Sequence, residues 1–577
     1  MKRLWIYLQD YKKECVLAPL FKMLEASFEL FVPLVVAAII DTGIANGDTG
    51  YILKMCMILI LLALIGLICS VTAQYFSAKA AIGFGTGLRR ALFKHLMGLS
   101  FTEIDMVGTS TMMTRMTSDV NQAQNGVNMV LRLFLRSPFV VFGSMVMAFT
   151  IDVKAAFIFV IAIILLSIVV FGIMLMNIPM LKSVQQKLDG VLGITRENLA
   201  GVRVIRAFCK EEEEIEAFKV KNEALTTAQK KAGKVSALMN PLTYVIINIA
   251  IVTLIWVGAI QVDNGILTQG QVVALYNYMS QILVELIKLA SLMITINKSV
   301  ACSNRIVSVF EIKSSMEEGV EPSAEGASRK SEVPVVAFKN VSLTYKGAGE
   351  ESLTGIDFTV WQGQTVGIIG GTGSGKTSLV HMIPRFYDAT AGEVLIDGVN
   401  VKAYQIKALR DKIGIVMQKA VLFKGDIGSN LRWGKKDATE EEILEAVRIA
   451  QGEDVVNQKG GLKGSIHQGG KNLSGGQRQR MSIARALVKK PAILILDDST
   501  SALDFATDAK LRGAIKTLDY KPTVFIVSQR ASSIQYADLI IVLDDGKMVG
   551  KGTHEELLEN CQVYSEIYHS QFRKEEN

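Results

Sequence analysis

The chain has 577 residues, of which 50% are hydrophobic, and a formal net charge of +7. This length exceeds a single domain, and the hydrophobic residues are concentrated before residue 300 in runs that an ordinary soluble protein would not contain. The six cysteines are scattered and include no C-x-x-C pair, so the sequence carries neither a zinc motif nor a disulfide framework.

Six apolar runs are long enough to cross a bilayer, which needs about 18 or more apolar residues. They cover residues 16–40, 52–73, 128–150, 155–177, 239–260 and 271–297. A soluble helical core would not need six runs of this length. The sequence therefore predicts an α-helical membrane domain with six transmembrane helices over residues 1–312.

Basic residues are distributed unevenly between the connections of these spans. The loops near 41–50 and 261–269 contain no Lys or Arg, whereas the segments 76–126 and 178–238 contain many. Positive loops stay in the cytoplasm, so both termini of this multi-pass protein are expected on the cytoplasmic side of the plasma or inner membrane. The same rule accounts for the net charge, and no nucleic-acid partner is expected. The two basic segments have helical periodicity and are expected to extend beyond the bilayer.

Several polar side chains fall inside the spans, where charge is costly and usually faces the bundle interior. These candidate cavity residues are Glu25, Glu29, Arg132, Arg136, Asn277, Gln281 and Glu285. They could contact a substrate, or they could pair with one another for structural reasons. Glu285 and Lys288 are also spaced for an i,i+3 pair.

A polar linker rich in Ser, Gly and Glu, residues 313–332, separates the spans from an α/β domain expected over 333–577. Near the start of that domain a G-x-x-x-x-G-K-T motif follows a predicted buried strand and precedes a predicted helix. The residues expected to contact ATP here are Gly370, Gly371, Thr372, Gly373, Ser374, Gly375, Lys376, Thr377 and Ser378. Backbone N–H groups of such a loop surround phosphates, Lys376 supplies charge, and the Thr377 hydroxyl suits Mg²⁺.

Two further motifs follow, Leu473-Ser474-Gly475-Gly476-Gln477 and a strand that ends in Asp497 and Asp498. Asp497, at the strand end, is expected to hold Mg²⁺ through water. Ser501-Ala502-Leu503-Asp504 comes directly afterwards. Together these motifs resemble those of ABC transporters, and the order of the domains resembles the exporter branch. The resemblance covers nearly the whole chain.

The resemblance implies roles for further residues. Tyr345 matches the aromatic residue that stacks on adenine, and Gln418 matches the glutamine that contacts Mg²⁺. Residues 197–208 resemble the region of the second coupling helix. In such exporters two chains pair, and each phosphate loop faces the signature motif of the other chain, whose residues here are Ser474, Gly475, Gly476 and Gln477, with Asp504 nearby. Because the signature begins a helix, Ser474 and the adjacent N–H groups can bind a γ-phosphate held by the partner.

The chain departs from the family pattern at two positions of its own phosphate-loop site. Asp498 stands where the family has the catalytic Glu, and its shorter side chain withdraws the carboxylate by roughly 1 Å, a displacement that can cost about 10²-fold in rate. Gln529 stands where the family has His, and an amide cannot become a cation or relay a proton. Gln468, before the signature, replaces a Glu.

We therefore expect an ATP-driven exporter half whose own site is degenerate and whose partner is an unlike ABC chain that carries the missing Glu and His. A homodimer that tolerates Asp498 and Gln529 at both sites is the alternative. The resemblance implies a lipophilic or amphiphilic cargo; a lipid or peptide exporter, or an ATP-gated channel or regulatory subunit, are the alternatives.

Overall fold

In the computed structural model the chain divides into two units, each of which combines residues that are distant in sequence. The described residues are 2–320, 333–499 and 501–572. The first unit contains Met1–Met97 and Ser110–Ile312, and the second contains Gly98–Thr109 and Lys313–Asn577. Most of the expected linker, residues 321–332, lies outside the described residues.

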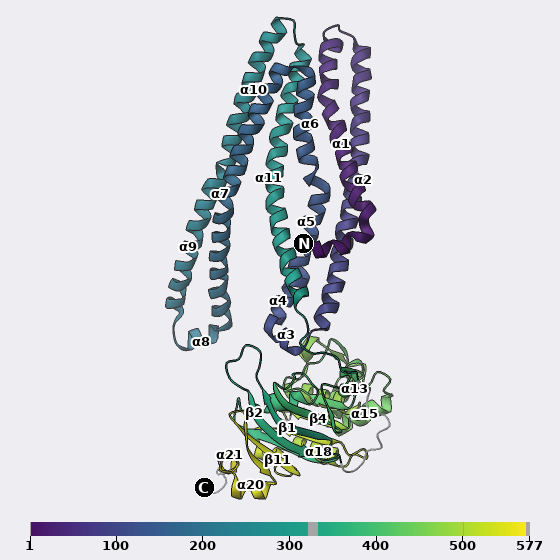
Figure 1. Ribbon diagram of the computed structural model, residues 1–577, viewed down its shortest axis with the longest axis vertical. Coiled ribbons are helices and arrows are strands. Elements are labelled where there is room, and N and C mark those ends of the chain that lie inside the picture. Colours follow the sequence, from purple (N-terminus) through teal and green to yellow (C-terminus); the bar gives the residue numbers. More distant parts are fainter. Residues whose placement is uncertain (1, 321–332, 500, 573–577) are drawn as a thin grey trace. The chain divides into compact units, whose positions relative to one another are not determined.

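The first unit is built from long helices (Figure 1). The helices that carry most of the apolar sequence are α1 (Lys12–Ala38), α2 (Thr49–Met97), α6 (Arg136–Ile151), α7 (Val153–Ala200), α10 (Met239–Asp263) and α11 (Gln269–Glu311). Six helical segments of the described chain are long and apolar enough to cross a membrane, which confirms the predicted number of spans. With 49 residues, α2 is about 70 Å long at 1.5 Å per residue, more than twice the hydrocarbon thickness.

Further helices, most of them short, connect or extend these. They are η1 (a 3₁₀ helix, Lys2–Tyr11), η2 (π, Ile39–Ile44), α4 (Thr109–Thr114), η3 (π, Arg115–Asp119), α5 (Val120–Met129), η4 (π, Val130–Phe134), α8 (Val202–Ala207) and α9 (Glu211–Ala237). The sequence predicted the third span as one run over 128–150. Instead, η4 interrupts it, and α6 begins only at Arg136. π-Segments widen a helix locally and often occur at functional sites.

Side-chain caps mark where two long helices of the first unit begin, α7 and α11. The Asp152 carboxylate accepts a hydrogen bond of 2.7 Å from the Ala155 N–H at the start of α7. At the start of α11, Thr268 and Gln271 form a capping box. Next to it, a Cβ on Gly270 would lie 2.4 Å from the Ala37 carbonyl oxygen, so glycine permits α11 to approach α1 closely.

The core of the first unit lies among α7, α10 and α11. Phe159, Leu254 and Tyr278, one from each helix, are fully buried in one apolar cluster. The Tyr278 hydroxyl donates a 2.5 Å hydrogen bond to the Leu30 carbonyl of α1, which satisfies the polar atom that burial would otherwise leave unpaired. This contact ties α11 to α1 inside the unit.

The second unit contains a ten-stranded sheet in the order β5-β4-β1-β2-β12-β11-β3-β10-β9-β6 and a two-stranded sheet of β7 and β8. The strands are β1 (Val336–Leu343), β2 (Leu353–Val360), β3 (Thr365–Gly370), β4 (Ala391–Ile396), β5 (Val399–Asn400), β6 (Ile413–Val416), β7 (Gly425–Asp426), β8 (Ser465–Ile466), β9 (Ile493–Asp497), β10 (Thr523–Val527), β11 (Leu539–Asp544) and β12 (Lys547–Gly552). The neighbours β11, β3, β10, β9 and β6 run parallel.

The carboxyl ends of parallel strands meet at one edge of a sheet, and this places the site. β3 ends at Gly370, β9 at Asp497 and β10 at Val527, so three predicted motifs converge there. The helices of this unit are α12 (Lys376–Met382), α13 (Ile406–Asp411), α14 (Ile427–Leu431), α15 (Glu440–Ile449), α16 (Glu453–Gln458), η5 (3₁₀, Gln468–Gly470), α17 (Gly475–Leu487), α18 (Phe505–Lys516), α19 (Ala531–Ile534), α20 (His554–Asn560) and α21 (Gln562–Phe572). The strand–loop–helix order at 365–382 is therefore as predicted.

One short helix from the first third of the chain belongs to the second unit. α3 (Phe101–Val107) packs its Phe101 ring 4.6 Å, centroid to centroid, from Phe386, and the Tyr387 hydroxyl donates a 2.6 Å hydrogen bond to Asp105. Glu103 is buried, which by itself opposes ionisation, but hydrogen bonds from Ser100 and Ser315 hold the pKa of its carboxyl below the ordinary value. The fold thus inserts a segment from between two spans into the nucleotide unit.

Candidate functional site

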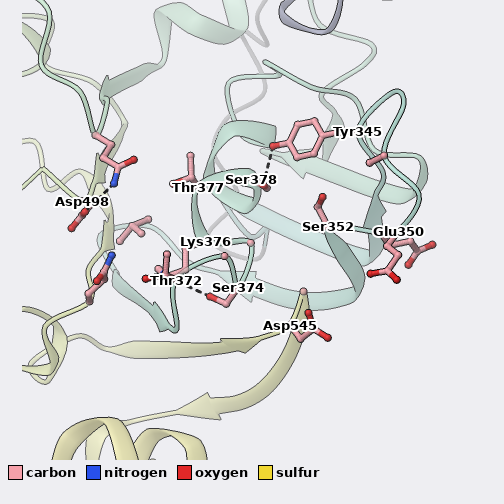
Figure 2. A pocket seen from close by; sticks show the side chains of 18 of the residues that line it. Tyr345, Glu350, Ser352, Thr372, Ser374, Lys376, Thr377, Ser378, Asp498 and Asp545 are labelled. Atoms are coloured by element: carbon pink, nitrogen blue, oxygen red, sulfur yellow. Dashed lines mark hydrogen bonds between the residues drawn. The ribbon is translucent and has the colours of Figure 1, made fainter. Parts of the chain in front are cut away.

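A cavity of about 850 Å³ lies at the carboxyl edge of the parallel strands in the second unit. Figure 2 shows its wall, with Lys376 and Thr377 on one side and Asp498 opposite them. The predicted residues that line it are Tyr345, Thr372–Ser378, Gln418, Asp498 and Gln529. The structure therefore brings together residues from five separate parts of the sequence.

The backbone of the phosphate loop requires glycine where it turns into α12. Gly375 has φ +91°, in the left-handed region, and a Cβ there would lie 2.7 Å from the Ser352 carbonyl oxygen. Side chains other than glycine rarely adopt this conformation, so the spacing of the motif reflects a steric need. α12 begins directly afterwards, and the N-terminal end of a helix favours a bound anion.

Lys376 is held inside the loop. Its Nζ donates to the carbonyl oxygens of Gly370 and Gly371 at 2.9 and 2.5 Å. Burial lowers the pKa of this ammonium, and the nearby carboxylates of Asp498 and Asp497 oppose that shift. Lys376 forms no salt bridge with another residue that the structure describes, so this buried cation is suited to a phosphate oxygen, which would supply the counter-charge.

The oxygen atoms expected to hold Mg²⁺ lie together beneath the cavity. The Thr377 hydroxyl donates to Asp497 Oδ1 at 3.0 Å. Asp497 Oδ2 is buried and has no hydrogen-bond partner among the described residues; His381 Nε2 lies 3.4 Å from it. A buried carboxylate oxygen left free is costly, so the pair fits a hydrated Mg²⁺ held by Thr377 and Asp497.

Asp498 stands one residue beyond the end of β9 and faces the cavity. Its Oδ2 accepts a 3.2 Å hydrogen bond from Gln418 Nε2. Its φ is +44°, a conformation that Asp tolerates better than most residues, and its N–H donates to the Val527 carbonyl at 3.0 Å. The carboxylate is therefore near the predicted catalytic position, on a short side chain already bonded to Gln418.

Gln529 also lines the cavity, and its backbone is held by a residue that sequence reasoning missed. Gln571, in α21, donates from Nε2 to the Gln529 carbonyl at 2.8 Å and accepts from the Ala531 N–H at 2.9 Å. One amide thereby bridges both sides of this loop. The two residues are 42 positions apart, and no motif marks Gln571.

Tyr345 approaches the cavity from the other wall. Its hydroxyl donates a 2.8 Å hydrogen bond to Ser378, and its ring meets Tyr387 edge-on at 4.9 Å between centroids. Burial raises the pKa of the Tyr345 phenol, so it stays protonated and neutral. Tyr387, which also bonds Asp105 of α3, is a second residue that the sequence did not identify.

The signature residues do not line this cavity. Ser474 caps α17: its Oγ accepts from the Gln477 N–H at 3.2 Å, and Gln477 Oε1 accepts from the Ser474 N–H at 2.9 Å. The hydroxyl proton and the first N–H groups of Gly475 and Gly476 remain available to an outside anion. Asp504, likewise outside the cavity lining, caps α18, and its bond from the Thr507 N–H lowers the pKa of its carboxyl.

In the first unit the candidate cavity residues separate into one group and two outliers. Arg136 joins Glu29 and Glu285, and a smaller cavity beside them is lined by Glu29, Asn277, Gln281 and Glu285. Glu25 instead pairs with Lys22 at 2.6 Å. Arg132 lies in η4 and is not among the described residues that line this cavity. The predicted Glu285–Lys288 pair is present at 2.9 Å.

Comparison with known proteins identifies the family. Residues 15–286 match the ABC transporter transmembrane region and residues 353–501 match the ABC transporter domain. An uncharacterised ABC transporter ATP-binding protein of Mycobacterium tuberculosis is 35% identical over 98% of this chain and 97% of its own length. An ATP-dependent lipid A-core flippase of Desulfotalea psychrophila is 33% identical over 84% of each chain.

A solved structure of a bacterial Atm1-family ABC exporter with ATP bound has the same fold, with a TM-score of 0.79 over 97% of this chain and 99% of that one, at 23% identity. The family matches agree with the motifs that converge on the larger cavity and with the six apolar helices. The chain is a multi-pass membrane protein that belongs to the ABC transporter family and has the fold of an ABC exporter.

Proposed function

We propose that this chain is one half of an ATP-driven exporter of lipophilic or amphiphilic compounds, and that its own phosphate-loop site hydrolyses ATP slowly. The observation that carries the proposal is the composition of the 850 Å³ cavity: Asp498 and Gln529, at the positions where the sequence predicts base and switch, both line it. The signature residues, in contrast, keep an undisturbed helix cap at Ser474.

The residues of the larger cavity have separate tasks in this proposal. Tyr345 offers its ring to adenine, and Lys376 with the loop N–H groups neutralises the phosphates. Thr377, Asp497 and the side-chain oxygen of Gln418 would hold Mg²⁺, and the ion would supply positive charge that screens the transferred phosphoryl group. Asp498 must orient the attacking water, but its carboxylate is short and already accepts the Gln418 hydrogen bond. Slow turnover follows from that geometry.

The partner in this proposal is an unlike ABC chain that carries the catalytic Glu and the switch His. Ser474 and the N–H groups of Gly475 and Gly476 would then complete the partner's site, because a helix N-terminus favours phosphate. ATP acts as the joint between the chains, and its hydrolysis removes the bias toward the closed state. A homodimer with two slow sites is the alternative.

The proposed membrane topology places both termini and the nucleotide domain in the cytoplasm, because the basic residues gather in the cytoplasmic connections. The transmembrane domain extends over 1–312, the linker over 313–332 and the nucleotide domain over 333–577. The flippase named among the relatives acts on lipid A-core, which supports an amphiphilic cargo without identifying it. An ATP-gated pathway is the second candidate, favoured by the weak base at Asp498.

Co-expression with neighbouring ABC chains tests the proposal. We expect a tagged chain to copurify with an unlike ABC chain and the pair to move an amphiphilic dye uphill into inverted vesicles only when ATP is hydrolysed. A chain that purifies as a homodimer with brisk ATP turnover would contradict the degenerate-site proposal. Downhill flux that needs ATP binding alone would favour the gated pathway.

A further inference from the structure

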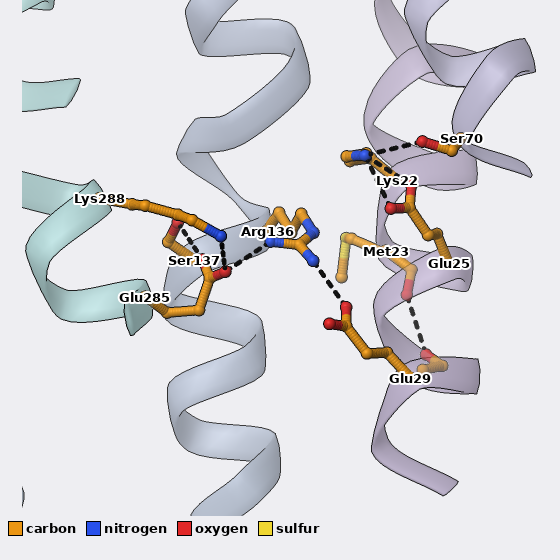
Figure 3. A network of polar contacts seen from close by, with 10 residues as sticks. Lys22, Met23, Glu25, Glu29, Ser70, Arg136, Ser137, Glu285 and Lys288 are labelled. Carbon is orange, nitrogen blue, oxygen red and sulfur yellow. Dashed lines mark hydrogen bonds and ion pairs between the residues drawn. The ribbon is translucent and has the colours of Figure 1, made fainter. Parts of the chain in front are cut away.

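A network of buried charge joins three helices of the membrane unit. Arg136, at the start of α6, bonds Glu29 of α1 and Glu285 of α11, each at 2.6 Å between nitrogen and oxygen. Figure 3 shows the guanidinium between the two carboxylates. Glu285 also accepts from Lys288 at 2.9 Å and from the Ser137 hydroxyl at 2.7 Å. Two acids and two bases therefore make a formally neutral group.

Mutual pairing explains part of this network but not all of it. Arg136 and Glu285 are buried, and each bonds two or more partners, as structural ions in an apolar region must. Glu29 and Lys288, in contrast, have side chains that are 43% and 52% exposed. Glu29 pairs with buried Arg136 and Lys288 with buried Glu285, and both exposed groups can form further hydrogen bonds.

Glu29 and Lys288 both line one cavity of about 430 Å³ beside the network. Gln281 also lines it, and its amide oxygen is buried with no hydrogen-bond partner among the described residues. Val32, Val140 and Val284 supply apolar walls. The Gln281 oxygen is closed to solvent, so the acceptor open to a ligand is the carboxylate of Glu29, which favours a ligand with N–H donors. The valines favour a ligand that also brings hydrocarbon.

We propose that this cavity binds the zwitterionic head group of an amphiphile, with its ammonium at Glu29 and its oxyanion at Lys288. The inference rests on the proposed export function and names the class of cargo for it. Neutrality is the deciding argument. Because the network already balances its own charges, a ligand with net charge would leave one uncompensated charge beside it, whereas a zwitterion satisfies both exposed ions and adds no net charge.

Binding to the purified full-length protein without ATP tests this. The probes are three short-chain lipids with identical acyl chains and different head groups, namely phosphoethanolamine, phosphoglycerol and trimethylammonium, followed by intrinsic fluorescence. We expect the phosphoethanolamine lipid to bind roughly tenfold more tightly than either charged lipid, the size of one charge-assisted hydrogen bond. Equal affinity for all three would overturn the proposal. Free phosphoethanolamine, which lacks acyl chains, shows how much of the affinity comes from the head group alone. If it binds as tightly as the lipid does, the valines do not contribute to binding.

Two variants locate the charges. Glu29→Gln should lower the affinity for the phosphoethanolamine lipid roughly tenfold and shift the head-group preference toward the phosphoglycerol lipid. Lys288→Gln should shift the preference toward the trimethylammonium lipid. Lys54→Gln, an exposed lysine of α2 outside the cavity, is the matched control and should change nothing. Unaltered head-group preference in both variants would contradict the assignment.

Binding of a fluorescent ATP analogue by each variant verifies that the protein is folded. Because the lipid titration uses no ATP, its failure is distinguishable from failure of the export proposal. Loss of ATP-driven transport with intact head-group selectivity would count against the pump and not against the cavity.

Discussion

Two surfaces of the nucleotide unit carry sequence motifs predicted to bind ATP, the phosphate-loop cavity and the start of α17. They differ in how many of the residues expected from the family each one has. At the phosphate-loop cavity, Asp498 accepts a hydrogen bond from Gln418, and Gln529 provides an amide where an ionisable switch is expected. At the start of α17, Ser474 and Gln477 form a complete capping box. The departures at the expected base and switch positions lie in the phosphate-loop cavity, whereas Gln468, the weaker departure, precedes the signature helix. This contrast is what a domain would show if its two surfaces served different ATP molecules, one cleaved rapidly and one slowly.

Restoring the family residues should produce the largest change. We expect Asp498→Glu combined with Gln529→His to raise ATP turnover of the purified transporter about 10²-fold, because the added methylene returns a carboxylate to the attacking water. Phosphate release measures this. The same double variant with Lys376→Ala is the control and should be inactive. Turnover unchanged by the double substitution would mean that these positions do not limit the rate.

Disturbing the other surface should have the next largest effect. Ser474→Ala removes a hydroxyl available to a phosphate held by the partner, so total ATP turnover should fall about 10-fold while nucleotide affinity at this chain's own cavity stays constant. Thr553→Ala is a matched control, because Thr553 caps α20 with the same box and touches no predicted phosphate. If Ser474→Ala and Thr553→Ala lower ATP turnover equally, the effect comes from loss of helix stability and not from loss of a phosphate contact.

A smaller effect is expected at the adenine end of the cavity. Tyr345→Ala should weaken ATP binding roughly threefold to tenfold, the value of an aromatic stacking contact. Tyr345→Phe keeps the ring and loses only the hydrogen bond to Ser378, so it should bind ATP nearly as the unaltered chain does. Titration with a fluorescent ATP analogue distinguishes them. If the two variants lose affinity equally, the hydroxyl and not the ring is responsible.

The smallest effect concerns the bridge from α21. Gln571→Ala deletes both bonds that hold the loop of Gln529 and Ala531, at about 1 kcal/mol each, so ATP turnover should change a few-fold. Gln562→Ala, in the same helix, removes an exposed bond to Glu566 and is the matched control. Identical turnover in the two variants would show that the bridge does not influence the site.

Local pattern was enough to predict much of this molecule. Runs of apolar residues gave the six spans, and the glycines of the phosphate loop, such as Gly375, mark backbone that only glycine adopts readily. Ser474 begins its helix as the motif indicates. These features depend on residues that are close in sequence. The order of the motifs along the chain is the other feature that resembles ABC exporters.

Contacts between residues that are distant in the sequence could not be predicted from it. Gln571 looks like any surface glutamine of a terminal helix, and its two bonds become visible only when α21 lies beside the loop after β10. The insertion of α3 beside Tyr387 depends on tertiary packing in the same way. Glu25 and Glu29 lie one turn apart in α1, yet Glu25 pairs with Lys22 of the same helix, whereas Glu29 bonds Arg136 of α6 and lines a cavity. The contact of Glu29 depends on the packing of α6 against α1, which helical spacing does not show.

The central claim, that this chain's cavity keeps its ATP while the other site of the transporter cleaves its own, is tested most directly by identifying the nucleotide bound after one turnover. Azido-ATP labelled at the α-phosphate is allowed to bind, incubated through a single turnover and cross-linked, and the nucleotide on each chain is then analysed. The account predicts intact triphosphate on this chain and diphosphate on its partner. Diphosphate appearing on this chain at the same rate would contradict it.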